Sequence, residues 1–114
     1  MAITPEETVQ KQLEAYNALD VESFVACYAD DAVLFKNGSE LMAGKAILRE
    51  RYGKLFTANP DLRCVVVRRE TGAGTVTDHE IVTGTAIGEL RARVHYEVKD
   101  GLIRRVDIFT GKGP

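Results

Sequence analysis

The hydrophobic period of the sequence changes at Asn59-Pro60-Asp61. Before this tripeptide, apolar residues recur at spacings of three and four, which predicts amphipathic helices. After it, apolar and polar residues alternate, which predicts strands. Proline disfavours the helical conformation of the residue before it, so the tripeptide is a natural end for a helix. A chain with its helices first and its strands last is typical of an α+β fold with one sheet.

Helix signals divide the first half of the chain. Thr4-Pro5-Glu6-Glu7 predicts a helix start, because threonine caps, proline suits the first turn and acids complement the helix dipole. A second, short helix is expected over Val21–Ala29, with Asp20 as its N-cap. A short strand over Ala32–Phe35 then precedes a third helix over Lys45–Thr57.

Four consecutive antiparallel strands are expected in the second half. The clearest is Leu90–Lys99, which alternates between apolar and polar residues and ends at Asp100-Gly101, a strong hairpin signal. The others are expected over Leu62–Glu70, Thr75–Thr85 and Leu102–Thr110. The fold class is therefore α+β, with a curved antiparallel sheet wrapped round three N-terminal helices. A bent sheet that its helices do not fill leaves a conical cavity, which is the default binding site.

Composition narrows the class of protein further. With 114 residues, we expect one domain over residues 1–114. A net charge of −2 offers no general attraction to nucleic acid or to anionic lipid, so neither is an expected partner. No run of about 18 apolar residues is present, which excludes a transmembrane helix. The first ten residues have two acids and no apolar segment, so they do not resemble a secretory signal. A cytoplasmic location is therefore expected.

The sequence contains none of the common metal or cofactor motifs. Cys27 and Cys64 are far apart and lie in apolar runs, which predicts two buried free thiols, with a catalytic thiol as the alternative. Zinc spacings, glycine-rich phosphate loops and nucleophile elbows are all missing. No cofactor and no metal is therefore implied.

Three separated motifs resemble the nuclear transport factor 2-like superfamily. They are Leu13–Asp20 with Phe24–Val33, then Gly44–Tyr52, then Tyr96–Val106. The resemblance covers nearly the whole chain and is closest to the short bacterial SnoaL-like and steroid delta-isomerase-like proteins. It implies a cystatin-like cone with an internal cavity, and a homodimer that pairs sheet to sheet. Because the superfamily includes isomerases, cyclases, hydrolases, dehydratases and non-catalytic modules, the fold alone does not give the function.

The ketosteroid isomerases of this superfamily provide the sharpest comparison. In that family, a tyrosine and a protonated aspartic acid hold the oxyanion, and a second aspartate is the base. The matching positions here carry Gln12, Val94 and Lys36. Losing a single oxyanion donor typically costs about 10²- to 10³-fold in rate. We therefore expect the chain not to isomerise Δ5-3-ketosteroids at a rate typical of that family.

His79 is the first candidate for proton transfer. Strand parity places it with Ile81 on one face and places Asp78 and Glu80 on the other, so we expect His79 to point inward. An inward imidazole can exchange a proton near neutral pH, and with Lys36 in the same cavity it would titrate as a coupled pair. The alternatives are a hydrogen-bonded core histidine or the opposite assignment of the two faces.

The remaining candidates surround the expected cavity. Lys36 could act as a base, a Schiff-base former or an anion anchor, or could simply be a turn lysine in water. Tyr16, Tyr28 and Tyr52 are expected on apolar helix faces, where each could donate a phenol hydroxyl to a substrate or could be an ordinary core aromatic. Gln12 adds a possible amide partner.

Together these patterns predict a protein that binds a small, mostly apolar or carbonyl-containing molecule. The expected chemistry is cofactor-free proton transfer of the isomerase, cyclase or dehydratase type. The alternative is a non-catalytic ligand-binding or dimerisation module. For the homodimer, parity predicts Val66 and Val82 on the outer face of the sheet, with Ile103 and Phe109 as further candidates.

Overall fold

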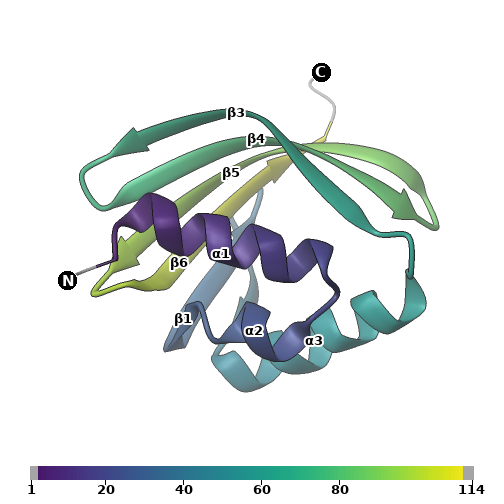
Figure 1. The fold of residues 1–114 in the computed structure, drawn as a ribbon, viewed down its shortest axis with the longest axis horizontal. Coiled ribbons are helices and arrows are strands. Elements are labelled where there is room, and N and C mark those ends of the chain that lie inside the picture. The colour runs from purple at the N-terminus through teal and green to yellow at the C-terminus, as the bar shows by residue number, and fades with distance from the viewer. Residues whose placement is uncertain (1–2, 112–114) are drawn as a thin grey trace.

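The computed structural model describes residues 3–111 as a curved sheet packed on helices (Figure 1). The helices are α1 (Pro5–Asn17), α2 (Val21–Val25) and α3 (Lys45–Ala58). The strands are β1 (Tyr28–Lys36), β2 (Ser39–Ala43), β3 (Arg63–Gly72), β4 (Thr75–Thr85), β5 (Gly88–Lys99) and β6 (Leu102–Thr110). The sheet curves around α1, which packs against β3 to β6, while α3 packs against β1 and β2 (Figure 1). The predicted α+β class is confirmed.

The sheet is mixed and has the order β2-β1-β6-β5-β4-β3. Strands β3 to β6 form the predicted antiparallel series. Strand β1 lies parallel to β6, and β2 pairs antiparallel with β1. This parallel pair joins a strand from the first half of the chain to the last strand of the second half, so the two halves share one sheet.

An Asn-Gly turn after β1 forms a hairpin, and its second strand, β2, was missed by the sequence analysis. Asn37 and Gly38 both have positive φ, at 50° and 88°, as a tight two-residue turn requires. Lys36 pairs with Ser39 across this turn, and β2 follows. Residues 36–39, which follow the strand expected over Ala32–Phe35, are therefore the turn of a hairpin.

The second helix is shorter than predicted, and Tyr28 belongs to a strand. The helix ends at Val25 rather than Ala29, and Tyr28 opens β1 opposite Ile103. The amide of Ile103 donates to the carbonyl of Cys27 at 2.8 Å. The spacing of Phe24, Val25 and Tyr28 fits a helix over such a short run, so only the pairing with β6 decides the conformation.

Local sequence signals explain the helix starts. The Thr4 hydroxyl accepts from the amide of Glu7 at 3.1 Å, and the Glu7 carboxylate accepts from the amide of Thr4 at 2.8 Å. This reciprocal pair is a capping box. Asp20 caps α2 in the predicted way by accepting from the amide of Ser23 at 3.1 Å. These caps fix where α1 and α2 begin.

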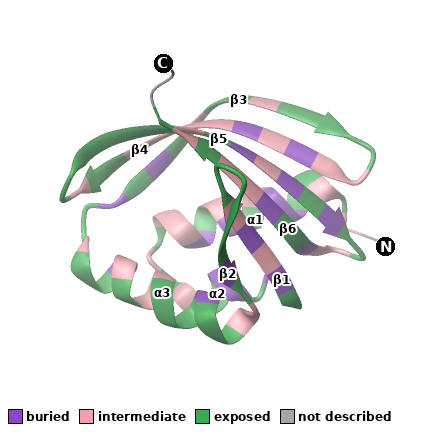
Figure 2. Cartoon of the chain, turned by 180° about the vertical axis from the view of Figure 1, so that it is seen from behind, coloured by how far each residue is buried: buried purple, intermediate pink, exposed green. Residues whose placement is uncertain are grey.

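Burial alternates along the strands, as Figure 2 shows. On β5, Val94, Tyr96 and Val98 are buried while the arginines between Leu90 and Val94 are exposed, which confirms the predicted faces of this strand. The helices contribute an aromatic cluster of Tyr16, Phe24, Tyr52 and Phe56, with ring centroids 4.5 to 6.4 Å apart. The core therefore lies between the inner face of the sheet and the helices.

The outer face of the sheet differs from the prediction in three residues. Val66 and Val82 lie on the inner face, and Ile103 is fully buried. Val65 and Val67 are exposed in place of Val66, and Phe109 is exposed as predicted. Three consecutive valines separate into two faces by parity, but nothing in them indicates which face is the inner one. None of the helices between residues 3 and 111 is long and apolar enough to cross a membrane.

Candidate functional site

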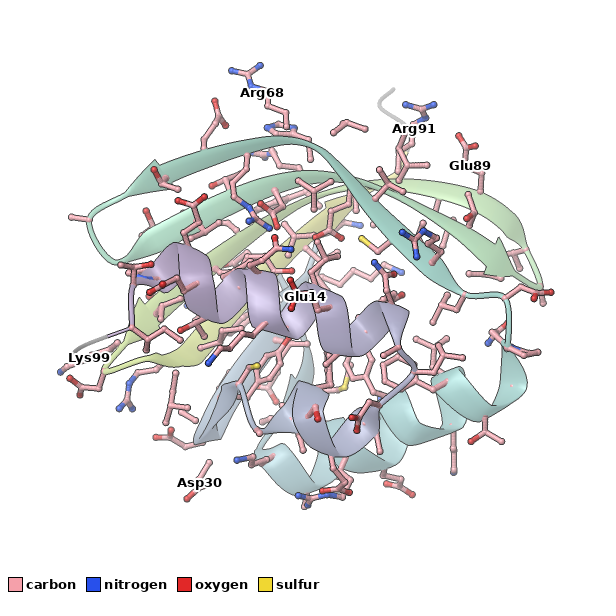
Figure 3. All side chains as sticks on the ribbon, in the orientation of Figure 1. Glu14, Asp30, Arg68, Glu89, Arg91 and Lys99 are labelled. Atoms are coloured by element: carbon pink, nitrogen blue, oxygen red, sulfur yellow. The ribbon has the colours of Figure 1, made fainter. Side chains whose placement is uncertain are left out.

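A cavity of about 280 Å³ lies between the helices and the inner face of the sheet. Side chains from α1, α3 and all six strands contribute to its wall. They are Gln12, Leu13, Tyr16, Tyr28, Lys36, Leu41, Tyr52, Leu55, Cys64, Glu80, Val82, Thr85, Leu90, Ala92, Val94, Tyr96, Val106, Ile108 and Thr110. The wall is mainly apolar, with a few polar groups that converge on it, as is typical of a small-molecule site. Arg68 and Arg91, in contrast, project outward from the sheet (Figure 3).

The structure places five of the six predicted site residues around this cavity. Gln12, Tyr16, Tyr28, Lys36 and Tyr52 all line it. Gln12 is buried, and its Nε2 donates to the hydroxyl of Tyr28 at 3.4 Å. Burial raises the pKa of all three tyrosines, so their phenols stay protonated near neutral pH and remain hydrogen-bond donors.

Lys36 lies at the exposed end of β1, on the rim of the cavity. The neighbouring residue fixes this end of the strand, because Asn37 exchanges hydrogen bonds with Thr110. Its Nδ2 donates to the Thr110 hydroxyl at 3.3 Å, and its Oδ1 accepts from the Thr110 amide at 3.0 Å. The amide of Asn37 also donates to the carbonyl of Ile108 at 2.8 Å. The β1–β2 turn, and Lys36 with it, is therefore tied to the end of β6.

His79 lies on the outer face, so the predicted inward orientation is wrong. Its side chain is 33% exposed, and its Nε2 is 3.3 Å from Oε1 of Glu70. It borders a shallow groove with Val67 and Arg93, not the cavity. The predicted coupled pair of His79 and Lys36 therefore does not exist. Parity had separated the two faces of β4 correctly, but two acids were a misleading sign of the outer one.

Glu80 is the cavity residue that the sequence analysis missed. Its carboxylate Oε2 accepts from the hydroxyl of Tyr96 at 3.2 Å. Burial raises the pKa of Glu80 to about 7, and repulsion by Asp78 adds to this, while hydrogen bonds from Cys64 and Tyr96 oppose it. A carboxyl with a pKa near neutral can both accept and donate a proton at physiological pH. Val76 and Val82 flank the two acids on the same face, but Ile81 lies on the other, so the strand by itself does not indicate which face is the inner one.

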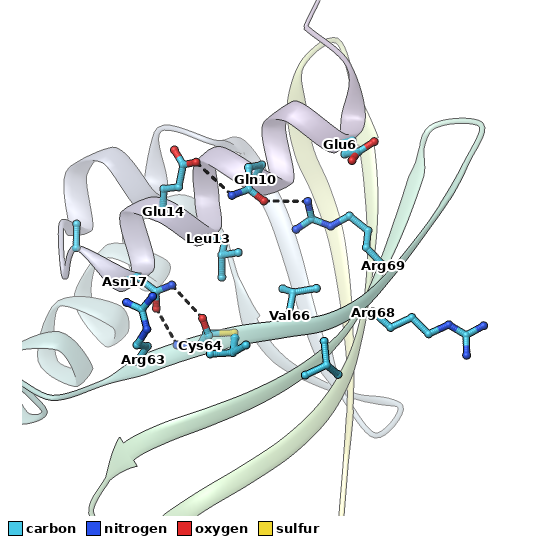
Figure 4. Close-up of a pocket in the computed structure, with 13 residues that line it drawn as sticks. Glu6, Gln10, Leu13, Glu14, Asn17, Arg63, Cys64, Val66, Arg68 and Arg69 are labelled. Atoms are coloured by element: carbon cyan, nitrogen blue, oxygen red, sulfur yellow. Dashed lines mark hydrogen bonds between the residues drawn. The ribbon is translucent and has the colours of Figure 1, made fainter.

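The other inward acid, Asp78, is neutralised by Arg69. Asp78 is 1% exposed, and the guanidinium donates to its two carboxylate oxygens at 2.6 and 2.9 Å. The two residues are direct partners across β3 and β4, so they form a buried cross-strand ion pair. A bulge between Val66 and Arg68 turns Arg69 inward, and Figure 4 shows it pointing toward α1 while Arg68 points away.

A larger and more open groove, of about 850 Å³, follows α1 and β3 (Figure 4). Structural hydrogen bonds cross it. Asn17 accepts from the amide of Cys64 at 2.7 Å and donates to its carbonyl at 2.9 Å. Arg69 Nη1 donates to Gln10 Oε1 at 2.9 Å. These contacts attach α1 to the edge of the sheet, so we assign the groove to helix docking rather than to chemistry.

Neither cysteine has the character of a nucleophile. Cys27 and Cys64 are both buried, and burial raises the pKa of each thiol. Cys64 borders the cavity beside Glu80, where a neutral thiol can only be a weak hydrogen-bond donor. Within residues 3–111, no group of three or more His, Cys, Asp or Glu side chains is arranged to hold a metal ion.

The comparisons with known proteins agree with this architecture. Residues 9–106 match the family model of the SnoaL-like domain. The chain belongs to the SnoaL-like domain family. No curated protein matches the sequence.

Three solved structures show how widely the SnoaL-like fold is shared. An uncharacterised cystatin-fold protein from Novosphingobium aromaticivorans has 22% identity and a TM-score of 0.87, with 93% of this chain and 97% of that chain covered. A proposed ketosteroid isomerase from Kribbella flavida has 22% identity and a TM-score of 0.77, with 96% and 79% covered. A proposed polyketide cyclase from Sinorhizobium meliloti has 16% identity and a TM-score of 0.78, with 93% and 99% covered. At these identities the likeness shows the fold.

This SnoaL-like domain also shows why ketosteroid isomerase groups cannot be transferred to it. Gln12, Lys36 and Val94, the three positions matched to that family, all line the same cavity. They line the cavity but carry neither a carboxyl nor a phenol group. The polar groups of this cavity come from other positions, chiefly Glu80 and Tyr96.

Proposed function

We propose that this SnoaL-like domain binds a small, mostly apolar carbonyl compound and catalyses cofactor-free proton transfer on it. Glu80 replaces His79 as the proposed acid/base. The observation that carries the proposal is a single carboxyl, with its pKa raised to about 7, in a largely apolar cavity ringed by phenols. Perturbed carboxyls in clefts are frequent at functional sites.

The proposed step is enolisation. The Glu80 carboxylate accepts a proton from the carbon next to the substrate carbonyl, the C–H electron pair forms a C=C bond, and the carbonyl π electrons move to oxygen. Tyr16 or Tyr52 donates a hydrogen bond to that oxygen as its negative charge develops. Return of the proton from Glu80 to a different carbon gives an isomer, and attack of the enolate carbon on a second carbonyl gives a cyclised product. Isomerase and cyclase are also the activities proposed for two of the structural relatives.

The test is the exchange of α-protons of 2-tetralone, a two-ring ketone, for deuterium in D₂O, followed by NMR. We expect the protein to accelerate the exchange and Glu80→Gln to lose most of that acceleration, because general acid–base groups typically contribute about 10²- to 10⁴-fold. Glu89→Gln changes an exposed glutamate outside the cavity and is the matched control. An unchanged rate for Glu80→Gln contradicts the assignment.

The second candidate is a non-catalytic ligand-binding domain. The outward position of His79 favours it, because the cavity then has no imidazole. In this case, 2-tetralone would bind, with chemical-shift changes at the cavity tyrosines, but its α-protons would exchange no faster than in buffer. The same NMR experiment therefore separates the two functions.

A further inference from the structure

The two charged residues of the cavity wall lie at separate places. In the described part of the chain, Lys36 is the only basic residue that lines the cavity, and Glu80 is the only acidic one. Lys36 pairs with Ile108 on β6, Ile108 with Val94 on β5, and Val94 with a residue of β4 two positions before Glu80. Three strand spacings of about 4.8 Å each, with two further residues of about 3.3 Å each along β4, place the two backbones roughly 16 Å apart along the sheet. The cavity thus has a positive end and a proton-exchanging end.

The positive end is the mouth. Lys36 is exposed, whereas Glu80 is half-buried and its carboxyl accepts a hydrogen bond from Tyr96, which is 3% exposed. Leu41 and Leu90 border the same cavity and are each 37% exposed, so the rim combines one cation with apolar surface. Thr110, which Asn37 holds in place, adds a hydroxyl to the wall nearby.

We propose that the ligand of this cavity is a small organic acid, with its carboxylate at Lys36, its apolar body in the cavity and its carbonyl toward Glu80. This inference rests on the proposed function for the role of the inner end. Charge complementarity sets the orientation, because a carboxylate beside Glu80 would meet a like charge, while one at the mouth meets an ammonium. A volume of about 280 Å³ is near the lower limit for ligand sites, so the body is one or two rings.

The sequence left Lys36 with several possible roles, among them a base, a Schiff-base former and an anion anchor. The arrangement of the cavity favours one of them. An amine at the rim is separated from the inner end, where the carbonyl would react, so it acts as an anion anchor rather than as the base. Its contribution is orientation, which places the reactive carbon of the ligand next to Glu80. Correct positioning of a bound substrate is itself a large part of catalysis.

The test compares 6-carboxy-2-tetralone with its methyl ester by calorimetric titration. We expect the acid to bind the parent protein about three- to tenfold more tightly than the ester, as for a single charge-assisted contact in a partly exposed site. The preference should weaken between 0.05 and 0.5 M salt because the mouth is open to solvent. Lys36→Met should abolish the preference and leave the affinity for the ester unchanged, and Lys36→Glu should reverse it.

Lys54→Met is the matched control, since Lys54 is 79% exposed on α3 and does not border the cavity. It should retain the full preference for the acid. Equal affinities for acid and ester in the parent, an unchanged preference in Lys36→Met, or no binding of either compound would overturn the inference. The proposed catalytic role of Glu80 fails on a different result, namely α-proton exchange that does not depend on Glu80, so the two failures are distinguishable.

Discussion

At the scale of residues, one carboxyl sets the chemical character of the molecule. Glu80 and Asp78 lie on the same face of β4, yet their environments differ. Arg69 donates two hydrogen bonds to Asp78, whereas the hydrogen bonds to Glu80 come from a phenol and a thiol, and the charge of Arg69 adds only a smaller attraction. A buried carboxyl with neutral donors is left with a raised pKa. The carboxyl with the raised pKa is therefore one that borders the cavity.

The raised pKa of Glu80 predicts that stability falls with increasing pH. Relative to an ordinary glutamate, the buried group favours the folded state fully below about pH 4.5, and this contribution is lost as pH rises through about 7. The shift corresponds to a loss of up to about 3 kcal/mol across that window. Urea unfolding at pH 4.5 and pH 7.5 should show this decrease in the free energy of unfolding with pH in the parent and in Glu89→Gln. A Glu80→Gln variant with the same slope as the parent would contradict the prediction.

At the scale of elements, the register of β3 against β4 decides which arginine meets the buried Asp78. The bulge between Val66 and Arg68 reverses the faces of the later part of β3, which points Arg69 inward opposite Asp78. Without that bulge, Arg69 would point to solvent and Arg68 would take the inward position opposite Asp78. The bulge therefore decides which of the two neighbouring arginines pairs with the buried acid.

Replacing Arg69 should destabilise the fold strongly. Arg69→Met leaves the nearly inaccessible Asp78 without its partner, and breaking a buried pair from one side typically costs about 3 to 5 kcal/mol. Arg69→Met combined with Asp78→Asn should recover most of that loss. Arg68→Met, at an exposed neighbour on the other face, should change the free energy of unfolding by less than about 0.5 kcal/mol. Equal effects of the two single variants in urea unfolding would contradict this account.

At the scale of the whole molecule, the outer face of the sheet presents a group of exposed apolar side chains. Val65 and Val67 are 46% and 60% exposed, and Phe109 is 37% exposed beneath the guanidinium of Arg93 at 4.4 Å. These side chains lie among arginines, so the face is mixed rather than wholly polar. An exposed patch of this kind on a curved sheet is typical of an interaction surface.

We expect this face to form a homodimer. A standard interface would bury about 800 Å² per partner, which a patch centred on Val65, Val67 and Phe109 could provide. Sedimentation equilibrium at micromolar concentration should give twice the mass of one chain, and Val67→Glu should shift the protein toward one chain. The mass of a single chain across the whole concentration range would exclude the dimer. Val82→Thr, at a position on the inner face, is the control that should leave the mass unchanged.

The site residues that could be predicted from the sequence lie on helices with a clear apolar stripe or on strands in which apolar and polar residues alternate strongly. Gln12, Tyr16 and Tyr52 lie on apolar helix stripes, and these stripes point to the cavity because a helix with one apolar face has one way to bury it. The faces of β5 were likewise predictable, since five apolar residues share one side. The face assignment of β4 failed because an isolated strand with polar residues on both sides has no such asymmetry.

The sequence by itself determined the fold class, the order of most elements, the helix caps and, away from the bulge in β3, which residues share a face of β4 and of β5, because these depend on local spacing and local hydrogen bonds. The tertiary structure alone decided which face of β4 is the inner one. Burial of Asp78 is favourable only when Arg69 approaches from another strand, and a partner on another strand leaves no trace in local spacing. For the same reason, the parallel pairing with β6 decided that Tyr28 reaches the cavity from a strand. The chemistry proposed for this protein rests on such contacts between strands, not on local spacing.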